Sequence, residues 1–137
     1  MSEWLVDTNV LLDVIGADSI FGERSLHTLT RLSEKGLLII NPIIYAEVGA
    51  MMDNIEELDD VLPPSIFHRD PLPWEACFLA GQTFQEYRRC GGTKSRMLAD
   101  FLIGAHAVVA NLGLVSRDRG YQQYFNNLTI IDPNEPG

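Results

Sequence analysis

Cysteine is scarce in this sequence, which limits how the chain can be crosslinked. Cys77 and Cys90 are its only two cysteines. They lie in a segment whose pattern predicts a helix, where thirteen residues of separation place them about 20 Å apart. A disulfide needs Cα atoms within about 7 Å, and the sequence has no Cys-x-x-Cys pair. The sequence therefore predicts two reduced thiols and no cysteine-bound metal.

Long hydrophobic runs are also absent. No apolar stretch approaches the roughly 20 residues of a membrane span, and the first residues lack the basic region and cleavage site of a signal peptide. We therefore expect a cytoplasmic protein that does not enter a membrane. With 137 residues, 46% of them hydrophobic, residues 1–137 are expected to form one domain with a sizeable core.

Positive charge is the third shortage. The formal net charge is −9, which argues against nonspecific binding to nucleic acid through phosphate contacts. The charge is unevenly distributed, however. Acidic residues crowd segment 53–60, whereas segment 88–119 holds six of the ten basic residues. Those six are Arg88, Arg89, Lys94, Arg96, Arg117 and Arg119. The C-terminal half therefore has a local cationic region that the total conceals.

Short apolar segments alternate with amphipathic ones along the chain, which is typical of an α/β fold. Strands are expected at 3–7, 37–40, 113–116 and 128–131, with another short strand within 65–70. A short helix or turn is expected at 9–16, and helices at 22–35, 42–52, 73–89 and 96–111, with an acidic helix ending near residue 63. Leu26, Leu29 and Leu32 form one apolar stripe of the second helix. This order predicts a mostly parallel sheet covered by helices.

Two aspartates follow expected strands. Asp7 ends the apolar run of the first strand, and Asp118 comes shortly after the strand at 113–116. Ligands of open parallel sheets bind beyond the carboxyl ends of the strands, so the two carboxylates are expected on one edge. The plainer alternatives are that Asp7 caps the next helix and that Asp118 belongs to a turn.

Two further carboxylates lie on apolar stripes of helices. The residues three and four positions from Glu47 are Ile43, Ile44, Ala50 and Met51. Asp100 has a similar setting among apolar and small residues, and Gly104 one turn later permits close approach of another backbone. Charged side chains are rarely buried unless they are paired or bind a metal. The alternative for Glu47 is a place at the edge of the stripe, with its carboxylate in water.

Carboxylates that converge repel one another, and a divalent cation removes that repulsion. A ligand set made only of oxygen suits Mg²⁺ or Mn²⁺ better than softer metals. Such an ion can activate water for attack on phosphorus. A haloacid-dehalogenase-type phosphatase also places an aspartate after its first strand, but it needs a second one two residues later. That position here is Asn9, which cannot serve as an acid or base.

The pattern Asp7-Thr8-Asn9, then Glu47 on a helix, then "DFLIGAHAVVANLGLVSRD" from Asp100 resembles the PIN-domain nucleases. The similarity is greatest to the VapC-type toxins of type II toxin–antitoxin pairs, and it spans residues 4 to about 131. It implies a PIN-like three-layer α/β/α sandwich with a central, mostly parallel sheet.

The resemblance also implies a site and an activity. Its catalytic, metal-binding acids would be Asp7, Glu47, Asp100 and Asp118, with Asn9 and Ser116 as hydrogen-bonding support. The activity implied is that of a Mg²⁺- or Mn²⁺-dependent endoribonuclease that hydrolyses RNA by a metal-activated water. Such toxins commonly form homodimers and are silenced by a partner antitoxin. Two alternatives stay open: a PIN-type nuclease of housekeeping RNA processing, and a non-catalytic PIN-like partner-binding module.

The remaining polar residues carry weaker expectations. Lys94 and Arg96 precede the helix of Asp100 and are expected either to reach RNA phosphate or to remain solvated loop charges. Arg117 and Arg119 flank Asp118, and one of them is expected to pair with it. His106 lies about 120° around the helix from Asp100, which predicts a packed or surface histidine and not a ligand.

Overall fold

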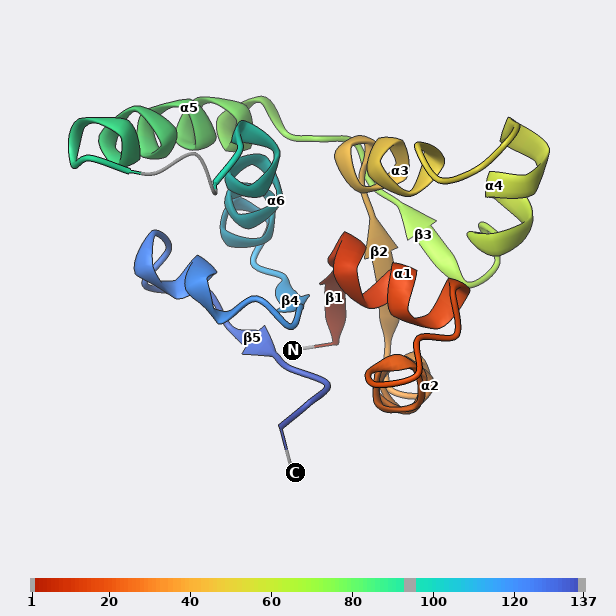
Figure 1. Ribbon diagram of the computed structural model, residues 1–137. Coiled ribbons are helices and arrows are strands. Elements are labelled where there is room, and N and C mark those ends of the chain that lie inside the picture. Colours follow the sequence, from red (N-terminus) through yellow and green to blue (C-terminus); the bar gives the residue numbers. More distant parts are fainter. Residues whose placement is uncertain (1, 93–95, 136–137) are drawn as a thin grey trace.

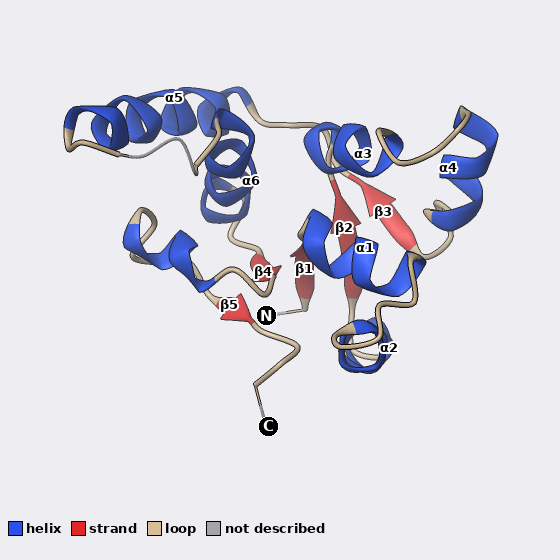
Figure 2. Cartoon of the chain, viewed as in Figure 1, coloured by secondary structure: helices blue, strands red, loops and turns tan. Residues whose placement is uncertain are grey.

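A computed structural model describes residues 2–92 and 96–135 of the chain. Its central sheet has five parallel strands in the order β3-β2-β1-β4-β5 (Figures 1 and 2). Their bounds are β1 Glu3–Val6, β2 Leu37–Ile40, β3 Phe67–Arg69, β4 Gly113–Val115 and β5 Ile130–Ile131. The order reverses between β1 and β4, so the chain places polar loops side by side at that point of the carboxyl edge.

Within the part of the chain that the structure describes, six α-helices and one 3-10 helix connect the strands. They are α1 Thr8–Ile15, α2 Gly22–Ser33, α3 Pro42–Gly49, α4 Ile55–Val61, α5 Trp74–Arg89, α6 Leu98–Val109 and the 3-10 helix η1 Arg119–Gln123. Asn41 caps α3 by accepting a hydrogen bond from the Ile44 N–H, and Pro42 occupies the first turn, as the sequence predicts.

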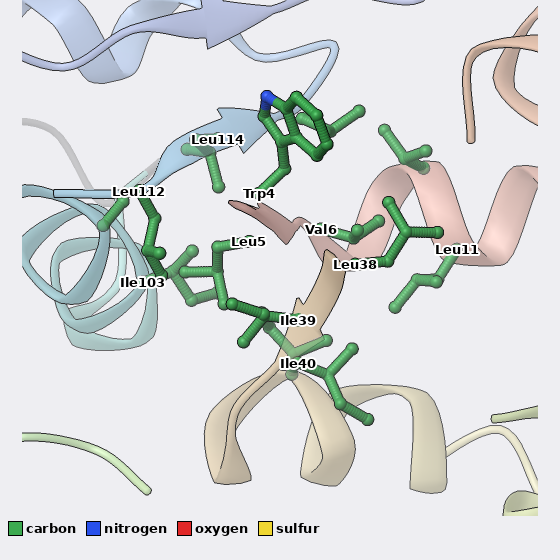
Figure 3. Close-up of a cluster of buried hydrophobic side chains, with 14 of the residues drawn as sticks. Trp4, Leu5, Val6, Leu11, Leu38, Ile39, Ile40, Ile103, Leu112 and Leu114 are labelled. Carbon is green, nitrogen blue, oxygen red and sulfur yellow. The ribbon is translucent and has the colours of Figure 1, made fainter. Parts of the chain in front are cut away.

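The core is divided between the two faces of the sheet. Figure 3 shows Val6 of β1 directed toward Leu11 of α1, whereas Leu5 points to the opposite side, toward Ile103 of α6. Successive residues of a strand face opposite sides, and β1 is buried on both. Helix α2 packs on α1, and α5 packs on α6. The result is the three-layer α/β/α arrangement that the sequence predicts.

Most differences from the expected elements are at their ends. The second helix stops at Ser33, α3 stops at Gly49 and α6 starts at Leu98. The expected stripe of α2 is wrong at one position: Leu29 and Leu32 are buried, but Leu26 is 53% exposed. Serine and threonine take its place on the inner face, since Ser25 and Thr28 are buried. A small residue suits this face because Gly22 and Ser25 meet the loop and helix around Asp13 closely.

Both cysteines are free, as predicted. No helix within the described ranges is long and apolar enough to cross a bilayer.

Candidate functional site

Asp7 lies where β1 ends and α1 begins, at the carboxyl edge of the sheet. Its backbone N–H donates to the carbonyl of Val115 on β4 (2.9 Å), so the residue is still held by the sheet. Its side chain caps α1 by accepting from the Thr8 N–H (2.8 Å). Only 4% of Asp7 is exposed. The capping role considered as an alternative is therefore present, and it fixes a buried carboxylate at the strand end.

The buried position makes ionisation of Asp7 costly. Burial raises the pKa of Asp7 to about 6, and the charge of Glu47 acts in the same direction. Hydrogen bonds from Ser116, from the Thr8 N–H and from Tyr121 favour the ionised form but do not offset the burial. Asp7 therefore carries a proton more readily than an ordinary aspartate whenever no cation faces it.

Ser116 and Asn9 hydrogen-bond to Oδ2 of Asp7. The Ser116 hydroxyl is buried and donates to Asp7 Oδ2 (2.7 Å), while Asn9 Nδ2 lies 3.3 Å from the same oxygen and 3.3 Å from Ser116 Oγ. Ser116 Oγ also accepts from the Asp118 N–H (2.9 Å), and Asn9 Oδ1 accepts from the Arg117 N–H (3.2 Å). The two side chains tie the loop after β4 to the start of α1.

Glu47 projects from α3 toward the same place. Thr8 donates its hydroxyl hydrogen to Glu47 Oε1 at 2.6 Å, which links α1 to α3. The carboxylate is half-buried, and the expected apolar stripe around it is incomplete, because α3 ends at Gly49 and Ala50 and Met51 are exposed. Glu47 thus lies at the end of the stripe, where it can face both the cluster and water.

Asp100 lies in the first turn of α6 and is half-buried. Its Oδ2 accepts from the Met97 N–H at 3.1 Å, so the carboxylate also serves the helix terminus. Gly104, one turn later, does permit a close approach, but not of another backbone as expected. A Cβ at Gly104 would fall against the rings of Phe125 and Tyr121. The small residue makes room for the aromatic segment after β4.

Asp118 forms an ion pair with Arg96. Both guanidinium η-nitrogens donate to the carboxylate, Nη2 to Oδ1 at 2.8 Å and Nη1 to Oδ2. The Gly120 N–H donates to Oδ1 as well (2.9 Å). Burial would raise the pKa of Asp118, but the hydrogen bonds and charge of Arg96 outweigh it and hold that pKa below its usual value.

The two arginines beside Asp118 pair elsewhere, so the expectation that one of them pairs with Asp118 is wrong. Arg117 makes a bidentate pair with the buried Asp13, through Nε (2.7 Å) and Nη2 (3.1 Å). Arg119 pairs with Asp132 and Glu135 at the C-terminal end. Residues adjacent in a loop point in different directions, so adjacency in sequence did not predict the partner. Much of the local cationic region is thereby neutralised.

Tyr121 is a site residue that the sequence analysis missed. It is 2% exposed, and it hydrogen-bonds to Asp7. Burial raises the pKa of Tyr121 above its ordinary value, and the charges of Asp7, Asp100 and Asp118 add to the effect. Its phenol is therefore a permanent donor among these acids. The only signal in the sequence was its place three residues after Asp118, which a core tyrosine would share.

His106 is buried, so of the packed and surface positions that the sequence allowed, the packed one is confirmed. Its Nδ1 lies 2.9 Å from the Asn41 amide nitrogen, which can only donate. Burial lowers the pKa of His106, so the ring is neutral and its Nδ1 accepts. The pair joins the end of β2 to α6 beneath the acids. Lys94, the other expected phosphate contact beside Arg96, lies outside the described residues.

Asp7, Glu47, Asp100 and Asp118 are here called the acidic cluster. Thr8 hydrogen-bonds to Asp7 and Glu47, and the charges of Asp7, Asp100 and Asp118 act on Tyr121. Their oxygens are the ligand type that Mg²⁺ and Mn²⁺ prefer. Within residues 2–92 and 96–135, no three acid, histidine or cysteine side chains lie close enough as they stand to hold one ion. Thr8 engages Glu47 and Arg96 engages Asp118 in this arrangement. The donor chemistry fits a hard divalent cation, and shared binding of one ion by three of these acids requires their side chains to move closer together.

Comparison with known proteins gives one family and several similar folds. A sequence model of the PIN domain matches residues 4–125. Comparison with curated protein sequences gives no match. Among solved structures, a chain of VapBC2 from Rickettsia felis bound to a promoter DNA fragment has a TM-score of 0.74 and 20% identity, covering 95% of this chain and 98% of that one.

Two further solved structures have similar folds. VapBC-1 from nontypeable Haemophilus influenzae gives a TM-score of 0.74 and 19% identity, covering 97% of this chain and 99% of that one. FitAcB from Neisseria gonorrhoeae gives a TM-score of 0.68 and 22% identity, covering 95% and 97%. At these identities the likeness shows a shared fold.

Proposed function

The chain belongs to the PIN domain family, and on that premise we propose that it is a metal-dependent endoribonuclease, the toxin of a type II toxin–antitoxin pair. The observation that carries the proposal is the buried carboxylate of Asp7. The fold holds it at the sheet edge with Ser116, Asn9 and Tyr121, at a cost that shows in its raised pKa. A carboxylate kept where its charge is unfavourable is characteristic of a functional site.

We propose that Asp7, Glu47, Asp100 and Asp118 would hold Mg²⁺ or Mn²⁺. When bound, such an ion supplies a water of lowered pKa and positive charge beside the phosphate. The chain's own contribution is positional. Ser116 and Asn9 hydrogen-bond to Oδ2 of Asp7, Tyr121 keeps a donor beside it, and the Met97 N–H donates to Asp100. None of these side chains is placed to act as a covalent nucleophile.

The substrate that we propose is RNA. We propose that Arg96 and Lys94 contact its phosphates. Arg96 precedes α6 and lies beside Asp118 of the cluster. Hydrolysis by an activated water leaves 5′-phosphate and 3′-hydroxyl ends, because the 2′-hydroxyl of the RNA takes no part.

The partner that we propose is a cognate antitoxin. The structural neighbours are VapBC and FitAcB complexes, and a net charge of −9 suits a basic antitoxin segment. We also propose a cytoplasmic homodimer, with residues 1–137 as one domain in each copy.

Metal removal tests the proposed activity. Purified protein is incubated with mixed RNA in Mg²⁺, in Mn²⁺ and in excess EDTA, and the product ends are identified by ligation and sequencing. We expect cleavage with either metal, no cleavage in EDTA, and 5′-phosphate ends. Undiminished cleavage in EDTA with 2′,3′-cyclic phosphate ends would contradict the proposal. Folded protein that cleaves no RNA with either metal would favour the non-catalytic partner-binding module.

A further inference from the structure

Arg96 brings a positive charge into the acidic cluster from the chain itself. Its side chain is 17% exposed and binds Asp118 through both η-nitrogens. The guanidinium carbon also lies over two aromatic rings, 5.5 Å from the centroid of Tyr121 and 5.8 Å from that of Tyr124. Asp118 raises the pKa of Arg96 further, and the charge of Asp100 adds to this. Arg96 thus contacts Asp118 and Tyr121 and interacts electrostatically with Asp100.

The loop after Asp118 is shaped to accept this guanidinium. Gly120 lies against it, and a Cβ at that position would collide with Arg96 Nη2. The Gly120 N–H donates to Asp118 Oδ1, so the carboxylate that receives Arg96 is fixed from the opposite side. The loop thus forms a binding site for one guanidinium group. This site consists of a bidentate carboxylate, two aromatic rings and a glycine that leaves space.

Binding of Arg96 at this site conflicts with metal binding. Asp118 Oδ1 accepts from the guanidinium and from the Gly120 N–H, and Oδ2 accepts from the guanidinium, so a divalent ion that bound Asp118 in this state would have to share Oδ2 with a cation. An arginine held beside the same acids would also repel the ion electrostatically. Arg96 and the metal therefore compete for the same negative charge.

We propose that Arg96 is a built-in counterion of the acidic cluster: it neutralises Asp118 in the metal-free protein, and a divalent cation displaces it on binding. The inference rests on the proposed metal-dependent function. One consequence is that the wild-type protein binds metal more weakly than its four acids would without Arg96. The other is that repulsion among the carboxylates is reduced in the metal-free protein.

Calorimetric titration with Mn²⁺ measures the competition without any assay of activity. We expect the Arg96→Met variant to bind Mn²⁺ about fivefold more tightly than the wild type, since an ion pair that is not fully buried is worth at most about 1 kcal/mol, which is about fivefold in affinity. Arg96→Lys keeps the charge but loses the planar fork, so its affinity is expected to fall between the two.

Arg69→Met is the matched control. Arg69 also pairs with an aspartate, Asp59 (2.7 Å), and also lies over a tyrosine, Tyr45 (4.8 Å), but it is not bound to the acidic cluster. Its loss changes net charge by the same amount, so it corrects for long-range attraction. In an Asp118→Asn background, removal of Arg96 is expected to change Mn²⁺ affinity less than about twofold, because the shared carboxylate is gone.

A second measurement needs no variant. In a Mg²⁺ titration followed by NMR, the Arg96 side-chain Nε–H signal is expected to shift while that of Arg69 stays in place. Equal Mn²⁺ affinity of wild type, Arg96→Met and Arg69→Met would overturn the inference and leave the metal site intact. A gain of about fivefold that persists with Asp118→Asn would also overturn it. Failure of every variant and the wild type to bind Mn²⁺ would overturn the proposed metal site, and the inference with it.

Discussion

The Asp7→Asn variant is expected to melt higher than the wild type at pH 8 in EDTA and to lose RNA cleavage in Mg²⁺. Asn keeps the shape of the side chain and can still accept from the Thr8 N–H, but it removes a charge that the fold buries. Its cleavage rate is expected to fall roughly 100-fold or more, since loss even of groups that only support metal ligands costs 10–100-fold.

The sign of the stability change follows from the raised pKa. The folded-state pKa of Asp7 is about 6, above its ordinary value of 3.8, so the folded protein binds this proton more tightly than the unfolded chain. The stability that Asp7 contributes is therefore complete below about pH 3.8 and is lost as pH rises through about 6. At pH 8 the shift corresponds to a loss of about 3 kcal/mol from the free energy of unfolding of the wild type. The variant avoids this loss, but its weaker hydrogen bonds offset part of the gain.

Melting curves at pH 5.5 and pH 8 check this expectation. We expect the variant to exceed the wild type by roughly 5 °C at pH 8 and by less at pH 5.5, where most Asp7 is protonated. The lower pH is set at 5.5 because the pI calculated from the sequence is about 4.6, and a protein near its pI precipitates readily. A variant that melts lower at both pH values and still cleaves RNA would make Asp7 a structural cap.

The Asp100→Asn variant is expected to lose cleavage by a similar factor while its melting temperature in EDTA changes by less than about 2 °C. The apolar neighbours of Asp100 in the sequence suggest that its charge is costly and that Asn would stabilise the protein. In the structure the carboxylate is half-buried and caps the Met97 N–H, a bond that Asn can retain. Removal of the charge and replacement of the cap are therefore both expected to change the melting temperature little.

Asp60→Asn serves as the control for Asp100→Asn. Asp60 is an exposed residue of α4 outside the acidic cluster, and its substitution removes the same charge. We expect this control to cleave RNA like the wild type. If Asp100→Asn also cleaves like the wild type but melts several degrees lower, Asp100 is a helix cap and not part of the site.

Periodic patterns predicted the sheet and the placement of Asp7 because both depend on local sequence. A continuous apolar strand followed at once by a capping residue fixes where the carboxylate lies, whatever the rest of the chain does. The same applies to Asn41 and Pro42 at the start of α3. The parallel order followed from strands that alternate with helices.

The partners of the charged side chains could not be predicted in this way. Arg96 and Asp118 are 22 residues apart, and they meet because α6 and the loop after β4 converge on the same edge. Arg117 lies nearer to Asp118 in sequence but turns toward Asp13 on α1. Tyr121 resembles a core tyrosine in sequence, and only the packing of η1 against Gly104 brings its hydroxyl to Asp7. These contacts depend on tertiary packing.

Diffraction from a Mn²⁺-soaked crystal at the manganese absorption edge tests the central claim most directly. We predict an anomalous peak at the carboxyl edge, within about 2.0–2.6 Å of carboxylate oxygens of Asp7 and at least one of Glu47, Asp100 and Asp118. In the same crystal, Arg96 should have left Asp118. A fully active protein whose only manganese peaks lie away from Asp7 would contradict the assignment of the acidic cluster as its nuclease site.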